Sequence, residues 1–148
     1  MEERIIYGKE EITSKKSMRI ILMENAEVKA RFAVEDRDVN IEIFHRGKNS
    51  KSDVVLKGFA RKKVNLAGRL RIEKGAEGGE GNLIIKGLSD GGRIEVVPAI
   101  EVYEKNASAG HGASIQEMDE EILFYLRSRG IGKRMAKKII IESFLNYL

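Results

Sequence analysis

The chain has 148 residues, of which 42% are hydrophobic and 34% charged, and its formal net charge is +4. This composition is typical of one globular domain and excludes an intrinsically disordered chain. The sequence contains no cysteine, which excludes disulfides and any metal or iron–sulfur site built from this chain's own thiolates.

The N-terminal segment, MEERIIYGKE, is charged and lacks the apolar region of a secretory signal. No apolar run in the sequence approaches the ~20 residues that span a bilayer. We therefore expect a cytoplasmic protein without a membrane partner.

From Met18 to about Tyr103, short apolar segments with a period of two predict β-strands. These segments are 20–23, 28–34, 39–44, 54–56, 64–72, 83–85 and 94–103. Glycine separates them and is expected in turns. The glycines concerned are Gly47, Gly58, Gly68, Gly75, Gly78, Gly79, Gly81, Gly87, Gly91 and Gly92.

Short strands at regular spacing fit a β-sandwich or barrel, and they also fit a parallel β-helix of stacked turns. No repeat of fixed length is present, so periodicity does not choose between these folds. Pro98 is the only proline. Because proline donates no backbone hydrogen bond, its strand must bend, bulge or lie at a sheet edge there.

A basic stretch lies between residues 46 and 71, where nine cations face one anion, Asp53. The cations are Arg46, Lys48, Lys51, Lys57, Arg61, Lys62, Lys63, Arg69 and Arg71. Nucleic-acid binding is one interpretation. A solvated strand face is favoured, since apolar residues alternate with the cations and only Phe59 could stack on a base. His45 precedes Gly47 and is interpreted as a solvated histidine at a strand end.

Residues 117–148 predict two helices after a β region spanning residues 1–116. Asp119 is the expected N-cap of the first helix, which Gly130 ends. The second helix follows Gly132, with a basic face opposite an apolar one. Its helical spacing is carried by Met135, Ala136, Ile139, Ile140, Ser143, Phe144, Tyr147 and Leu148, and its basic face by Lys133, Arg134, Lys137 and Lys138.

His111 lies between two glycines in the segment 108–113, SAGHGA. An accessible neutral imidazole binds metals or carries protons. The plainer alternative is a turn histidine that hydrogen-bonds to the backbone, and the residues alone favour it.

The segment 106–148 resembles the C-terminal end of the SufB/SufD family, the scaffold subunits of the SUF iron–sulfur cluster assembly machine. The resemblance rests on 108–113 (SAGHGA), 118–121 (MDEE), 124–130 (FYLRSRG) and the closing Phe144-Leu145. Segments 74–76 and 78–81 extend it upstream to about Arg46. It implies a mainly β fold, a truncated right-handed parallel β-helix with two C-terminal α-helices.

The resemblance implies that His111 is a metal-site residue where two subunits meet. SufB-type proteins have glutamate at the position of Gly112 and cysteine at that of Gly92, and many relatives have cysteine at that of Ala109, so the chain is more similar to SufD. No cofactor is expected to bind stably to this chain alone. A transient iron–sulfur cluster is expected at an interface with a partner that supplies thiolates.

The sequence has no GxxxxGK[ST] phosphate loop, and we expect no enzymatic activity. The resemblance implies a separate SufC-type ABC ATPase that docks on the C-terminal helices, alongside packing of the same apolar residues across the open end of the β-helix. The expected ATPase contacts are Phe124, Tyr125, Leu126, Arg127, Arg129, Lys137, Ile140 and Phe144.

A truncated β-helix exposes strand edges, which favours a homodimer or pairing with a SufB-like chain. The expected function is therefore a non-catalytic scaffold for iron–sulfur cluster assembly. Two alternatives stay open, a structural or regulatory ATPase-binding protein without metal contact and a basic nucleic-acid-binding β protein.

Overall fold

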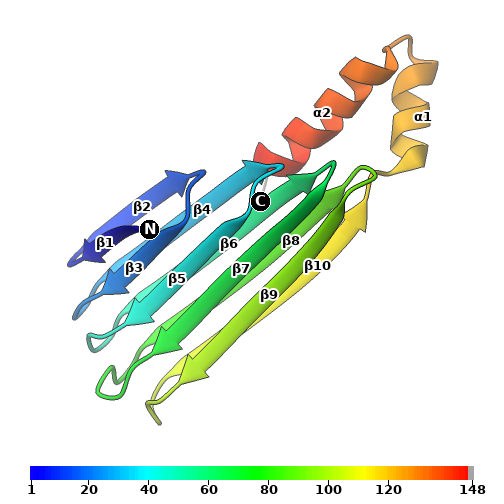
Figure 1. Cartoon of the computed structure of the whole chain (residues 1–148). Helices are drawn as coiled ribbons and strands as arrows, with labels where there is room; N and C mark the ends of the chain where they lie inside the picture. Colours follow the sequence, from blue (N-terminus) through cyan, green and yellow to red (C-terminus); the bar gives the residue numbers. More distant parts are fainter. Residues whose placement is uncertain (147–148) are drawn as a thin grey trace.

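The computed structural model describes residues 1–146 of the chain, which form ten strands followed by two helices (Figure 1). The strands are β1 (Glu2–Ile6), β2 (Lys9–Ser14), β3 (Met18–Leu22), β4 (Glu27–Glu35), β5 (Val39–His45), β6 (Lys51–Ala60), β7 (Lys63–Ile72), β8 (Glu80–Ser89), β9 (Arg93–Val102) and β10 (Ser108–Glu117). The helices are α1 (Glu120–Ser128) and α2 (Lys133–Asn146).

Successive strands alternate between two parallel sheets, so that each pair of strands makes one turn of a β-solenoid. The first sheet has the order β1-β3-β5-β7-β9 and the second has the order β10-β8-β6-β4-β2. The solenoid with two C-terminal helices confirms the fold class expected from the family resemblance.

The turns of the solenoid lengthen along the chain. Glu2 pairs with Met18, 16 residues later, whereas Lys63 pairs with Arg93, 30 residues later. Each strand still pairs in register with its neighbour in the same sheet, but the number of residues between paired positions changes from turn to turn. This lengthening explains why the sequence shows no repeat of fixed length.

The interior between the sheets is filled by alternate side chains from both, in one continuous apolar cluster. Gly58, Gly68 and Gly81 were expected in turns, and this is wrong, because they lie inside β6, β7 and β8. A Cβ at these positions would come within 2.6–2.8 Å of a leucine side chain. The leucines are Leu66, Leu83 and Leu70, respectively. Gly87, also expected in a turn, lies inside β8 and makes room for Ile94 in the same way. Each glycine therefore accommodates a large side chain, as close packing requires.

Three strands were not among the predicted ones. β1 and β2 have charged residues at Glu2, Arg4 and Glu10, which are paired in register with buried apolar residues of the next turn. β10 is rich in glycine and serine. None of these three strands shows the alternation of apolar and polar residues on which a strand prediction depends.

Of the three alternatives for Pro98, a bend, a bulge or a sheet edge, the structure shows the edge. β9 pairs with β7 and is the last strand of its sheet among residues 1–146, and Pro98 lies opposite Gly68. An edge strand tolerates a residue without a backbone donor.

The first helix begins as expected. The side chain of Asp119 accepts hydrogen bonds from the backbone N–H of Glu121 at 2.9 Å and of Ile122 at 3.3 Å. Gly130 ends the helix with a φ of +88°, a conformation that glycine adopts without strain. The helical positions expected at Tyr147 and Leu148 lie outside the described residues.

The second helix packs on the outer face of the second sheet, near the carboxyl ends of β4 and β6 (Figure 1). There Ile141 joins an apolar cluster with Phe59, Leu88 and Met118. The expectation that the helical apolar residues also close the end of the solenoid is wrong, since this cluster lies outside the interior.

His45 is fully buried, so its interpretation as a solvated histidine is wrong. Its Nδ1 lies 2.8 Å from Ser50 Oγ and its Nε2 lies 2.8 Å from Ser52 Oγ. The Ser50 hydroxyl donates to Gly47 O at 2.8 Å, so we infer that Nδ1–H donates to Ser50 and that Ser52 donates to Nε2. Burial lowers the pKa of His45 from 6.5 to about 4.

This shift makes the stability of the fold dependent on pH. The unfolded chain binds a proton at His45 below its ordinary pKa of 6.5, while the folded chain resists it down to about 4. Stability is therefore lost as pH falls through this window.

Between pH 7 and pH 5, we expect the free energy of unfolding to fall by about 2 kcal/mol more in the wild type than in His45→Gln. Urea unfolding at a series of pH values measures the difference, because carboxylates common to both proteins cancel. If the free energies of unfolding of the two proteins change with pH in parallel, burial of this imidazole does not govern the pH dependence of stability.

Candidate functional site

The last turn of the solenoid, β9 with β10, leaves its inward side chains uncovered. In the preceding turn the corresponding residues are fully buried, as at Leu66, Leu70, Leu83 and Ile85. Their register partners in the last turn are half-buried or exposed. These partners are Val96, Ile100, His111 and Ala113.

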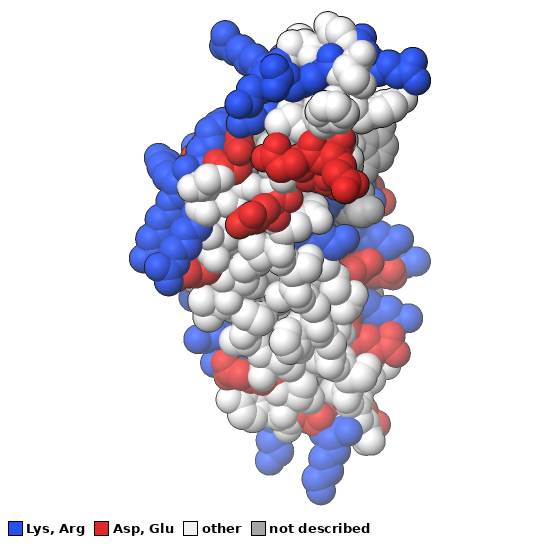
Figure 2. Space-filling view, turned by 90° about the vertical axis from the view of Figure 1, so that its right-hand side faces the viewer, with Lys and Arg blue, Asp and Glu red and all other residues white. Residues whose placement is uncertain are grey.

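This open end is largely uncharged. Figure 2 faces the β9–β10 side and shows a broad area without charged residues, bounded by charges above and below. Ile115, in register with Gly87, is 51% exposed there. Contiguous exposed apolar surface of this kind marks a site of association.

His111 lies in the middle of this open end. It is paired in register with the fully buried Leu83, so its imidazole occupies an inward position of the last turn. The side chain is exposed only because the described chain adds no further turn over it. Another chain covering the β9–β10 end would also cover His111.

The donor set around His111 is small. Within residues 1–146, no three His, Asp or Glu side chains gather closely enough to hold a metal ion. The place of the SufB-type cysteine, Gly92, has no room for a side chain. A Cβ there would lie 2.6 Å from Lys62 O and 2.7 Å from Ala60 O. The chain thus offers one imidazole, and any cluster held here needs its thiolates from elsewhere.

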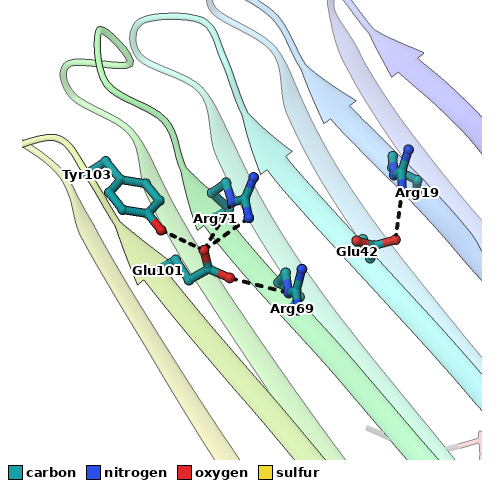
Figure 3. Close-up of polar contacts among 6 residues, drawn as sticks. All are labelled: Arg19, Glu42, Arg69, Arg71, Glu101 and Tyr103. Atoms are coloured by element: carbon teal, nitrogen blue, oxygen red, sulfur yellow. Dashed lines mark hydrogen bonds and ion pairs between the residues drawn. The ribbon is translucent and has the colours of Figure 1, made fainter.

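A polar cluster stabilises the edge strand β9 from the outside (Figure 3). Tyr103 donates to Glu101 Oε2 at 2.8 Å, and Arg71 donates to the same oxygen through Nε and Nη2 at 3.2 and 3.1 Å. Arg69 Nε lies 3.3 Å from Glu101 Oε1. The hydrogen bond from Tyr103, followed by attraction to Arg71 and Arg69, lowers the pKa of Glu101. The same hydrogen bond raises the pKa of Tyr103.

This cluster is not apparent from the sequence alone, because Arg69 and Arg71 belong to the basic stretch 46–71 and Glu101 lies 30 residues after Arg71. The spacing of two between Arg69 and Arg71, and between Glu101 and Tyr103, was the available signal. It places each pair on one strand face.

The basic stretch does not form a free cationic surface. Five of its nine cations pair with acids of other turns, and Lys57 is buried. The ion pairs are Arg46–Glu73, Arg61–Asp36, Lys63–Glu95, Arg69–Glu101 and Arg71–Glu101. This pairing supports the solvated strand face over a nucleic-acid site.

Two charged side chains fix α2 to the solenoid. Lys57 Nζ donates to Phe144 O at 2.8 Å, and burial, with repulsion from Lys86 and Arg31, lowers the pKa of Lys57. Near the other end of the helix, Lys137 Nζ lies 2.8 Å from Asp90 Oδ2.

The expected ATPase contacts fall into two groups. Lys137, Ile140 and Phe144 are engaged with the solenoid through the ion pair and the apolar cluster just described. The other five lie on or just after α1, which packs against α2 and stands away from the sheets (Figure 1). They are Phe124, Tyr125, Leu126, Arg127 and Arg129.

The most exposed apolar side chains of α1 are Phe124, at 75%, and Tyr125, at 55%. Leu126 is half-buried, and Arg127 and Arg129 are exposed. The Arg129 guanidinium lies 5.3 Å from the centre of the Tyr125 ring. This group therefore combines apolar and cationic side chains that are accessible to a partner.

No helix within residues 1–146 is both long and apolar enough to cross a membrane.

Comparison with known proteins identifies one family. Residues 30–144 match the family described as SUF system FeS cluster assembly, SufBD core domain. The chain is 28% identical over 123 residues to an iron–sulfur cluster assembly SufBD family protein of Mycobacterium tuberculosis, covering 77% of this chain and 14% of the relative. It is 29% identical over 115 residues to the iron–sulfur cluster assembly protein SufB of Bacillus subtilis, covering 75% and 25%.

A third relative, an iron–sulfur cluster assembly SufBD family protein of Staphylococcus haemolyticus, is 29% identical over 113 residues, covering 74% of this chain and 24% of the relative. The chain thus spans a quarter or less of the length of these relatives.

Proposed function

The chain belongs to the SufBD family of SUF iron–sulfur cluster assembly proteins, and on this premise we propose that it is a non-catalytic scaffold subunit. It pairs through its β9–β10 end with a second copy or with a SufB-like chain, and it binds a SufC-type ABC ATPase through its helices. The observation that carries the proposal is the apolar open end with His111 at its centre.

Two physical features favour pairing at this end. Covering the inward side chains of β9 and β10 removes apolar surface from water, which stabilises association. The same two strands are sheet edges within residues 1–146, so their free backbone groups can hydrogen-bond to strands of another chain.

Pairing gives His111 a role. The imidazole becomes part of an interface, close to donors that the other chain contributes. A cysteine-bearing partner would supply the thiolates that this chain lacks. The iron–sulfur cluster is the cargo of the assembly, held transiently between two chains.

The helices provide the second contact. The Lys57 and Lys137 anchors hold α2 on the second sheet, so a force applied to α1 reaches the strands through α2. The ATPase drives the motion, and this chain transmits it. The protein acts in the cytoplasm, where SUF assembly partners are available to it.

One alternative keeps ATPase binding and removes the metal contact. It treats the His111 imidazole as a bystander in a structural interface, and it is favoured by the scarcity of other ligands near His111.

The first test concerns pairing. Ile115→Lys places a charge on the inward face of β10, where it must be desolvated on association. We expect at least a ~100-fold weaker dimer, about 2.7 kcal/mol, by analytical ultracentrifugation. Val97→Lys is the matched control, because Val97 is 57% exposed on the outer face of β9. Equal association of both variants, alone and with a SufB-like chain, contradicts pairing through this end.

The second test concerns the ATPase. The double variant Phe124→Ser/Tyr125→Ser removes the most exposed apolar side chains of α1, and we expect at least ~10-fold weaker binding to a purified SufC-type ATPase by calorimetry. Ile5→Ser, which changes an exposed residue of β1 at the opposite end of the solenoid from α1 (Figure 1), should bind like wild type. Unchanged affinity of the double variant would rule out α1 as the docking element.

The third test separates the proposal from its alternative. His111→Ala should keep pairing and ATPase binding but reduce cluster transfer about 10-fold or more in a system reconstituted with the ATPase and a SufB-like chain, because a cluster donor is lost. Undiminished transfer by this variant favours the ATPase-binding protein without metal contact.

A further inference from the structure

The two ends of the solenoid differ in the chemistry of their inward side chains. At the β1–β2 end, Glu2, Arg4 and Glu10 are paired in register with Met18, Ile20 and Val28. All three of these partners are buried apolar residues. The three charged side chains thus occupy positions that are apolar in the next turn.

These charges form a bridge across the interior. Arg4 Nη2 lies 3.8 Å from Oε1 of Glu2 on the same strand. Arg4 Nη1 lies 3.8 Å from Oε1 of Glu10 on β2, which belongs to the other sheet. Each of the three side chains stays 39–48% exposed. Beside them Ile6 and Ile12 are buried and fill the remaining inward space. The bridge covers the apolar interior and presents charge to water.

Stacking another chain on this end would bury all three charges, which carries a large desolvation penalty. Strand length opposes it as well. β1 and β2 have 5 and 6 residues, whereas β9 and β10 have 10 each. A head-to-tail stack would therefore leave much of the β9–β10 end uncovered.

We propose that the Glu2–Arg4–Glu10 bridge is a polar cap that limits the assembly to two copies. The inference rests on the pairing of two copies at the β9–β10 end. A solenoid with two adhesive ends grows without limit, whereas one adhesive end closes after a single contact. The cap makes the chain a one-ended unit, so that a dimer presents a polar surface at both of its outer ends.

The test removes the cap without changing the strands that carry it. The triple variant Glu2→Val/Arg4→Ile/Glu10→Val makes the inward positions apolar. The matched control is Glu3→Val/Lys9→Val/Glu11→Val, which removes the same charges from the outward positions of β1 and β2. Sedimentation velocity over a wide concentration range measures the mass of each protein.

We expect the wild type and the outward control to stop at twice the mass of the chain. The inward variant should continue to grow with concentration beyond twice that mass. If the wild type grows beyond a dimer, or if the inward variant stops at a dimer like the control, the bridge does not limit the assembly to two copies.

A wild type that stays monomeric refutes the pairing of two copies at the β9–β10 end. This outcome differs from the outcomes that refute the cap, so the two hypotheses can fail separately. Should the triple variant fail to fold by circular dichroism, Arg4→Met/Glu10→Met breaks the bridge between the sheets with less change and is measured in the same way.

Discussion

Every turn of this solenoid depends on a neighbour to cover its inward side chains. Within the stack, strands from adjacent turns pair in parallel and fill the interior with one continuous apolar cluster. The two end turns each lack one neighbour. The two end turns differ in the chemistry of their inward side chains. One end is covered by charged side chains of the chain itself, and the other is left apolar around His111.

The remaining surface follows from the same arrangement. Because parallel strands stay in register, charged residues on the outer faces meet partners of opposite sign on adjacent turns, as Arg19 meets Glu42 at 3.1 Å (Figure 3). These contacts are worth little singly, but they neutralise a stretch that looks strongly basic in the sequence. The helices add an arm anchored on one sheet, with Phe124 and Tyr125 left accessible. The proposed scaffold function would use both features, the β9–β10 end for pairing and the helices for binding the ATPase.

The sequence predicted the parts of the fold that depend on local pattern. The strand alternation between residues 20 and 103, the N-cap Asp119 and the glycine stop at Gly130 follow from neighbouring residues, and all three are confirmed. The solenoid itself came from the family resemblance, because its turns lengthen and leave no constant repeat. Gly68 and His45 could not be placed correctly, since their surroundings come from the opposite sheet or the next turn. The inward position of His111 was not predictable either, because it depends on the register between β10 and β8.

Amide hydrogen–deuterium exchange, followed as the protein concentration is raised through self-association, tests the central claim most directly. We expect β9 and β10 to gain protection, because both their free edge and their inward face become covered, while β1 and β2 exchange at an unchanged rate. Association without added protection in β9 and β10, or with protection confined to β1 and β2, would contradict it.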